Sequence, residues 1–119
     1  MSNSLPNNIY YAQEEILDKI KADFNLIDDK DWHQLYQHKT DNTFWRLDKW
    51  DKYQTQFFVR IETLSNWVSF DDKELRIVLL LNTRGTSNEK CSWGNCNKSS
   101  LHGLAYCERH AYEEMGIRK

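Results

Sequence analysis

The amino-acid sequence predicts an α+β fold, in which N-terminal helices pack on a small antiparallel sheet and a knuckle of metal-ligand residues ends the chain. Three observations lead to this prediction. Apolar residues recur at helical spacing over the first 24 positions, strand-like alternation begins after Asp41, and all three cysteines lie in the last quarter beside a histidine. We therefore divide the chain into an α+β body, residues 1–90, and a C-terminal module, residues 91–119, packed on the body as a single structural domain.

The helical part is expected near residues 8–24, after a loose leader. Apolar side chains recur there every three or four positions, at Ile9, Ile16, Leu17, Ile20 and Phe24. Asn8 is a plausible cap of this helix. The acidic run at 28–31 suits the start of a short second helix carrying Trp32, Leu35 and Tyr36, because carboxylates stabilise a helix N-terminus.

The sheet is expected to contain three or four strands. Residues 43–47 are rich in strand formers, residues 56–62 alternate clearly, and residues 66–70 are a third candidate. In the second segment, Phe57, Val59 and Ile61 would face the core, with Phe58, Arg60 and Glu62 on the opposite face.

Two further helices are predicted towards the C-terminus. Residues 71–85 alternate like a strand, but Asp71 and Glu74 form a capping-box pattern and Gly85 suits a helix C-terminus, so we favour a helix. A final short helix is expected over residues 107–115, ending at Gly116.

Length and composition indicate an ordinary globular protein. A chain of 119 residues suits one domain and buries about two thirds of its unfolded surface. Hydrophobic residues make up 39% and charged residues 29%, and no segment approaches the ~18 consecutive apolar residues of a membrane helix. The first residues lack a basic region followed by an apolar one, so we expect no signal peptide and, with reduced cysteines, a cytoplasmic protein.

The cysteines and one histidine have the spacing of a metal site. Cys91, Cys96, Cys107 and His110 form the pattern C-x4-C-x10-C-x2-H. Gly94 allows the first gap to curl so that both thiolates face one ion, and the last two ligands lie one turn apart at the start of a helix. Three sulfurs and one imidazole complete a tetrahedral shell for Zn²⁺ with no open position, which predicts a structural zinc knuckle.

Other interpretations of these residues stay open. A disulfide with one free thiol would require an oxidising compartment, and three unrelated buried cysteines are a further alternative. His102 is a rival to His110 as fourth ligand, although no other ligand residue adjoins it in sequence. The pattern resembles the short C-x4-C…G-x-x-x-C-x2-H knuckles of small bacterial and phage proteins, including some HNH nucleases. This resemblance implies the local fold only, because the HNH catalytic histidines and asparagine have no counterpart here.

Catalytic signals are absent from the sequence. It contains no nucleophile elbow, phosphate-binding glycine loop or H-E-x-x-H motif, and cysteines that hold zinc are not free to act as nucleophiles. Of 16 basic and 18 acidic side chains, 4 and 3 lie in residues 91–119, which leaves 12 and 15 for residues 1–90. Neither part is strongly basic. We therefore expect no enzyme and consider nucleic acid an unlikely ligand.

Residues 44–53 are the other unusual stretch, because aromatic and basic side chains alternate there with aspartates. They could form ordinary core and surface, a protein interface, or a platform on which bases stack. As a protein interface, the stretch would use Trp45, Asp48, Trp50, Asp51 and Tyr53 as partner-binding residues.

The whole chain resembles bacterial immunity proteins, which neutralise polymorphic or contact-dependent toxins. The local likenesses are Trp45-Arg-Leu-Asp-Lys-Trp50 and Leu104-Ala-Tyr-Cys-Glu-Arg-His-Ala-Tyr112. The resemblance implies a non-catalytic protein that occludes a basic toxin domain. Two alternatives remain: a zinc-stabilised nucleic-acid-binding or regulatory protein, and an accessory domain of a small zinc-dependent nuclease.

Overall fold

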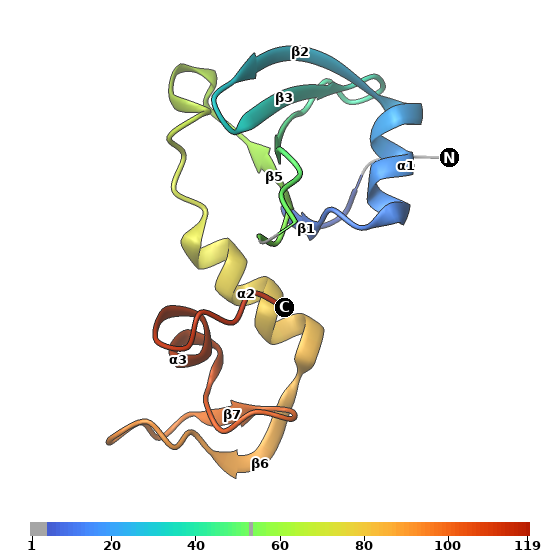
Figure 1. Ribbon diagram of the computed structural model, residues 1–119. Coiled ribbons are helices and arrows are strands. Elements are labelled where there is room, and N and C mark those ends of the chain that lie inside the picture. Colours follow the sequence, from blue (N-terminus) through green and yellow to red (C-terminus); the bar gives the residue numbers. More distant parts are fainter. Residues whose placement is uncertain (1–4, 53) are drawn as a thin grey trace. The chain divides into compact units, whose positions relative to one another are not determined.

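A computed structural model describes residues 5–52 and 54–119, and it divides the chain into two compact units. The first unit ends at Asp72 and is called the sheet unit; the second, Lys73–Lys119, is called the metal unit (Figure 1). This division differs from the boundary predicted at residue 90. Residues 73–90 belong to the C-terminal unit because the helix among them packs on that unit's core.

The sheet unit holds an antiparallel sheet that has five strands among the described residues, in the order β1-β5-β4-β3-β2. The strands are β1 Ile9–Tyr11, β2 Phe24–Lys30, β3 His33–His38, β4 Phe44–Asp48 and β5 Phe57–Ile61. The helix α1, Glu14–Asp23, connects β1 to β2. The predictions of α+β architecture and of strands at 43–47 and 56–62 are confirmed.

One face of the sheet, called the helix face, carries an aromatic core against α1. Trp45, Leu47 and Phe58 are buried there with Ile20 of α1 and Phe24 at the start of β2. The rings of Trp45 and Phe58 stack at 5.0 Å, and Phe24 meets both rings edge-on. Such aromatic pairs add to the stabilisation that burial alone provides.

The opposite face, called the loop face, is also buried. Register places Ile9, Val59, Arg46 and Leu35 in one row across four strands. Arg46 is only 2% exposed in this apolar row, and its guanidinium donates to the carbonyls of Trp67, Val68 and Phe70. A single side chain therefore fastens the segment after β5 onto the sheet. Because both faces are covered, Phe58 is buried and not, as predicted, opposite the core.

Three sequence predictions for this unit are wrong. The N-terminal helix begins at Glu14 and not near residue 8, because Ile9–Tyr11 pair with β5 as a strand. The second helix does not form: residues 24–38 make the β2–β3 hairpin, whose turn has Asp31 at a φ of 53°. The third strand at 66–70 is replaced by a 3₁₀ turn, η1 Leu64–Asn66, and an irregular segment.

The metal unit packs two helices and a small hairpin around its own core. It consists of α2 Lys73–Arg84, β6 Thr86–Lys90, β7 Ser99–Leu101 and α3 Glu108–Glu113. The core joins Ile77 and Leu80 of α2 with Leu101, Ala111 and Tyr112. The helices predicted over 71–85 and 107–115 are confirmed, and Gly85 and Gly116 follow them at a φ of 70°. None of the helices in the described part of the chain has the length and apolar character needed to span a bilayer.

Candidate metal centre and partner-binding surface

The three cysteines and His110 come together in the metal unit. Cys91 follows β6, Cys96 lies in the next turn, Cys107 precedes α3, and His110 lies within that helix. Their four ligand atoms lie within 4.8 Å of one another and could hold a metal ion. All three cysteines are free thiols, so the disulfide interpretation is not supported. His102, the rival fourth ligand, is not part of the cluster.

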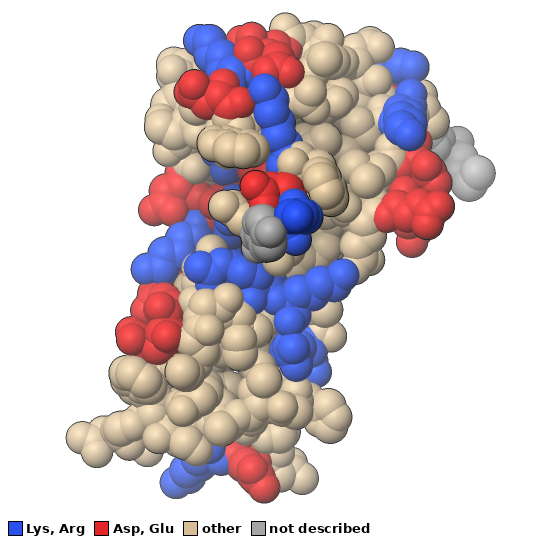
Figure 2. Space-filling model, in the orientation of Figure 1, with Lys and Arg blue, Asp and Glu red and all other residues tan. Residues whose placement is uncertain are grey.

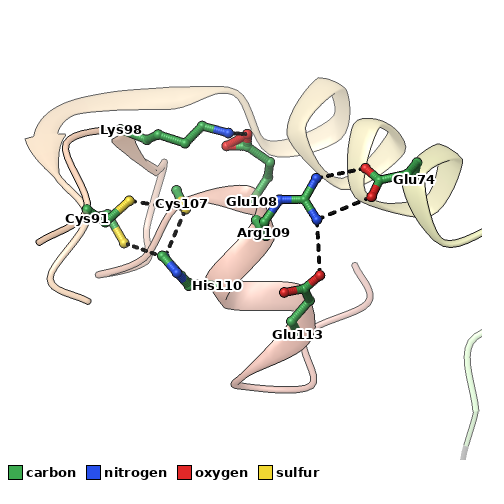
Figure 3. Close-up of polar contacts among 9 residues, drawn as sticks. Glu74, Cys91, Lys98, Cys107, Glu108, Arg109, His110 and Glu113 are labelled. Carbon is green, nitrogen blue, oxygen red and sulfur yellow. Dashed lines mark hydrogen bonds and ion pairs between the residues drawn. The ribbon is translucent and has the colours of Figure 1, made fainter. Parts of the chain in front are cut away.

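The ligand atoms face a common point. Nδ1 of His110 lies 3.4 Å from Sγ of Cys91 and 3.3 Å from Sγ of Cys107, and Sγ of Cys96 lies 3.9 Å from Sγ of Cys107 (Figure 3). Nδ1 is therefore the nitrogen available to an ion. Cys91 and Cys107 are buried at 5% and 0% exposure, whereas Cys96 is only partly buried.

The thiols differ in how readily they ionise. Burial disfavours the Cys91 thiolate, but hydrogen bonds from the backbone of Cys107 and Trp93 and from the His110 and Cys96 side chains outweigh it and lower the pKa of Cys91 to about 6. Burial raises the pKa of Cys107. One thiolate is therefore favoured at neutral pH, and a bound cation would favour ionisation of the others.

The two residues between Cys107 and His110 fasten the site to its surroundings. Glu108 is 7% exposed and accepts a 2.6 Å bond from Lys98, which lies between the second cysteine and β7. Arg109 reaches both Glu74 of α2 and Glu113 of α3 (Figure 3). The helix that follows Cys107 and contains His110 is thus tied to the segment before β7 by Lys98 and to α2 by Glu74.

An aromatic side chain flanks the imidazole. The Trp93 ring, 40% exposed, stacks on the ring of His110 at 5.4 Å with an interplanar angle of 26°. Tyr106 meets Trp93 edge-on at 6.2 Å. Sequence reasoning missed Trp93, Lys98, Glu108, Arg109 and Glu74 as supports of the site. For Trp93, Lys98, Glu108 and Arg109, the only available signal was a position between two candidate ligands in the sequence.

The predicted partner-binding residues do not form one exposed group. Trp45 is 2% exposed in the core of the helix face, so its prediction as a surface anchor is wrong. Asp48 is partly buried, lies 3.2 Å from Nδ1 of His33 and accepts from the Phe57 N–H. Trp50 is 73% exposed, Asp51 is partly buried, and Tyr53 lies outside the described residues.

Another exposed tryptophan lies on a backbone segment next to the one that carries Trp50. Trp32, in the β2–β3 turn, is 62% exposed, and its carbonyl accepts a 2.8 Å hydrogen bond from the N–H of Lys49. The backbone segments that carry the two indoles are therefore adjacent. Sequence reasoning missed Trp32 as a surface residue because it placed this residue in a helix that does not form.

Comparisons with protein-family models, with curated proteins and with solved structures found no match for this chain.

Proposed function

We propose that the metal unit holds one structural zinc ion through Cys91, Cys96, Cys107 and His110. The observation that supports this proposal is the distance pattern of the ligand atoms. With Zn–S of about 2.3 Å and Zn–N of about 2.0 Å, a tetrahedral site requires about 3.8 Å between sulfurs and about 3.5 Å between sulfur and nitrogen. The distances of 3.9, 3.4 and 3.3 Å match these values. The donor set also suits zinc, because three thiolates and one imidazole are ligands that it prefers.

Metal analysis of the purified protein tests this proposal. We expect one zinc per chain by elemental analysis and native mass spectrometry, and loss of that zinc in Cys107→Ser. His102→Ala is the matched control, because this histidine lies outside the cluster, and it should retain full zinc content. A protein that contains no zinc, or a Cys107→Ser variant that retains it, would contradict the proposal.

We also propose that the sheet unit binds another protein and has no catalytic role. The observation that supports this is that two exposed tryptophans, Trp32 and Trp50, lie on adjacent backbone segments. Tryptophan is enriched among the residues that dominate protein interfaces, and an indole left 62% or 73% in water gains apolar burial when a partner covers it.

The charge of the sheet unit favours a basic partner. Residues 73–119 hold 8 of the 16 basic and 5 of the 18 acidic side chains, so the formal charge is +3 there and −5 in residues 1–72. A surface of this sign accelerates association with a cationic protein. Within this class we propose an immunity protein that occludes a basic toxin domain, because a toxin that acts on nucleic acid must be cationic around its site.

Nucleic acid is the alternative ligand, and the metal unit is where it would bind. Several cations of the metal unit form ion pairs within the unit: Lys73 pairs with Glu113, Lys98 with Glu108, and Arg109 with Glu74. Cations that are already paired with carboxylates contribute little to phosphate binding. This observation favours the protein-binding proposal.

A protection assay with a toxin domain encoded beside the gene tests the protein-binding proposal. We expect the wild type to bind and neutralise the toxin, and Trp32→Ser and Trp50→Ser each to weaken the complex by about 1–4 kcal/mol. Leu64→Ser is the matched control, since Leu64 is an exposed apolar residue of η1 at 44% exposure. Unchanged affinity in a folded Trp32→Ser/Trp50→Ser double variant would place the interface elsewhere. Absence of binding by the wild type would remove the toxin proposal.

A further inference from the structure

The outer edge of β2 has no neighbouring strand among the described residues, although the N–H of its first residue, Phe24, already donates to the Ile20 carbonyl. Among the described strands, β2 pairs only with β3 and forms one end of the sheet, whereas the other end, β1, has three residues. β2 has seven residues, and five of them are exposed. An edge strand presents unpaired N–H and C=O groups to water and can accept a further strand.

Apolar side chains accompany this open edge. Leu26 and Ile27 are exposed by 51% and 46% in consecutive positions. Leu26 is paired with Tyr36, whereas the register shift between Leu26 and Asp28 leaves Ile27 without a cross-strand partner. Proteins normally protect edge strands with lysines, prolines, helices or very short length. β2 has one lysine, Lys30, and a register shift, which also protects an edge, but it contains no proline and is not short. Exposed apolar residues on a long edge need a different explanation.

Carboxylates follow the apolar pair along the same strand. Asp28, Asp29 and Asp31 succeed one another around Lys30, and Figure 2 shows acidic and basic side chains mixed at the β2 end of the sheet unit. Asp29 is neutralised by Lys49 at 2.7 Å. Asp28 accepts only the Asp29 N–H, and Asp31 has no side-chain partner among the described residues. Two carboxylates at the end of the edge are thus available to a cation.

We propose that the free edge of β2 binds an extended basic segment of a partner protein, which adds to the sheet as a further strand. The proposal rests on the protein-binding role proposed above and names its mode. Backbone groups of β2 supply the hydrogen bonds, Leu26 and Ile27 contact apolar side chains of the segment, and Asp28 and Asp31 pair with its lysines or arginines. Trp32 in the adjoining turn extends the same surface.

A second copy of this chain is a less suitable occupant. It would bring an identical edge with the same carboxylates, and each sheet unit carries a formal charge of −5. Like charges brought together across an interface disfavour the complex. A basic segment has the opposite charge, so its electrostatic interaction with the edge is attractive, whereas that of a second copy is repulsive.

The test uses a seven-residue blocked peptide of alternating lysine and valine, added to the full-length zinc-loaded protein. We expect saturable amide chemical-shift changes in β2 by NMR and slower hydrogen exchange of its outward amides. A glutamate–valine peptide of equal length should cause neither. The variant Leu26→Lys/Ile27→Lys should bind the lysine peptide about tenfold more weakly, because it replaces the apolar contacts with repulsive charges. Leu64→Lys is the control for added charge, and circular dichroism verifies that each variant is folded.

The outcomes separate this proposal from the broader one. Shifts confined to the tryptophans, or equal binding by the double-lysine variant, would overturn the edge proposal and leave protein binding intact. A concentration-dependent dimer that Leu26→Lys/Ile27→Lys abolishes would identify a second copy as the occupant and also overturn it. If the edge takes up the lysine peptide but no toxin domain binds, the toxin proposal alone fails.

Discussion

At the scale of single residues, Arg46 shows how burial changes the meaning of a charged residue. In the sequence it is one of several cations between aromatic residues, and alternation alone does not reveal that the face it points to is covered. In the structure, its guanidinium donates to three carbonyls and pairs with Asp72 at 2.8 Å, with both side chains at least partly removed from water. The segment that makes these contacts has no regular pattern, so the sequence could not predict it.

Replacing Arg46 by methionine should destabilise the sheet unit strongly. The substitution keeps an apolar stem but leaves the Asp72 carboxylate and three carbonyls without their donor. Removing one partner of a buried ion pair typically costs about 3–5 kcal/mol. Urea unfolding followed by circular dichroism measures the loss. Arg60→Met on the neighbouring strand is the control, because Arg60 is exposed, and it should change stability by less than about 0.5 kcal/mol. Equal effects of the two substitutions would mean that the Arg46 contacts contribute little.

His33 should make the stability of the sheet unit depend on pH. Burial, and then the charge of Arg46, lower the pKa of His33 below its usual 6.5, although Asp48 acts in the opposite direction. The unfolded chain therefore binds a proton more readily than the folded one. The contribution is fully favourable above pH 6.5 and is lost as the pH falls through the folded-state pKa. Urea unfolding at pH 7.5 and pH 5 should show a smaller difference for His33→Gln than for the wild type.

At the scale of elements, sequence reasoning succeeded where a local signal had no competitor. The strands around Trp45 and Val59 were predicted because strand formers and alternation pointed to one answer. The helix ending at Gly85 was predicted from its terminal signals, which conflicted with strand-like alternation. Sequence reasoning failed at residues 24–38, where an acidic run suited a helix start. Asp31 in a two-residue turn made a hairpin instead, with β3 paired on both sides. Pairing of this kind depends on distant residues and overrides local preference.

The end of α2 should be sensitive to the residue at position 85. Gly85 has a φ of 70°, and its N–H donates to the Leu81 carbonyl at 2.8 Å. A Cβ added at this position would meet no other atom within 4 Å, so Gly85→Ala should lose stability only through backbone conformation, by about 1 kcal/mol. Gly85→Asn should lose less, because asparagine tolerates this conformation. Thermal unfolding of the two variants compares their stabilities directly. An alanine variant as stable as the wild type would contradict the expectation that the positive φ at position 85 favours glycine.

At the scale of the whole molecule, the cluster of candidate metal ligands was predictable from spacing, but the unit that it belongs to was not. Three cysteines and one histidine at short intervals are recognisable as a candidate ligand set from the sequence alone. The extent of the unit depends on Ile77 and Leu80, whose packing on Leu101 and Tyr112 carries no signal in the ligand pattern. For this reason the first unit ends at Asp72, and α2 belongs to the metal unit.

Removal of the proposed zinc ion should therefore loosen the metal unit well beyond the ligand segment. Treatment with a chelator should increase hydrogen exchange in β6, β7, α3 and the part of α2 that packs on Leu101 and Ala111. The sheet unit has its own core, with Trp45, Phe58 and Ile20, and should keep its protection. Hydrogen-exchange mass spectrometry resolves the two units. Simultaneous loss of protection in both would show that they do not fold independently.

The stacking of Trp93 on His110 gives the metal centre an optical signature. An excited indole is quenched by groups in contact with its ring, and here that group is a candidate ligand at 5.4 Å. Metal binding changes the electron density and the mobility of the imidazole, and so should change the emission of Trp93. The difference between the fluorescence of the wild type and of Trp93→Phe isolates this signal from that of the other tryptophans. The protein can then report occupancy of its own metal site without an added dye.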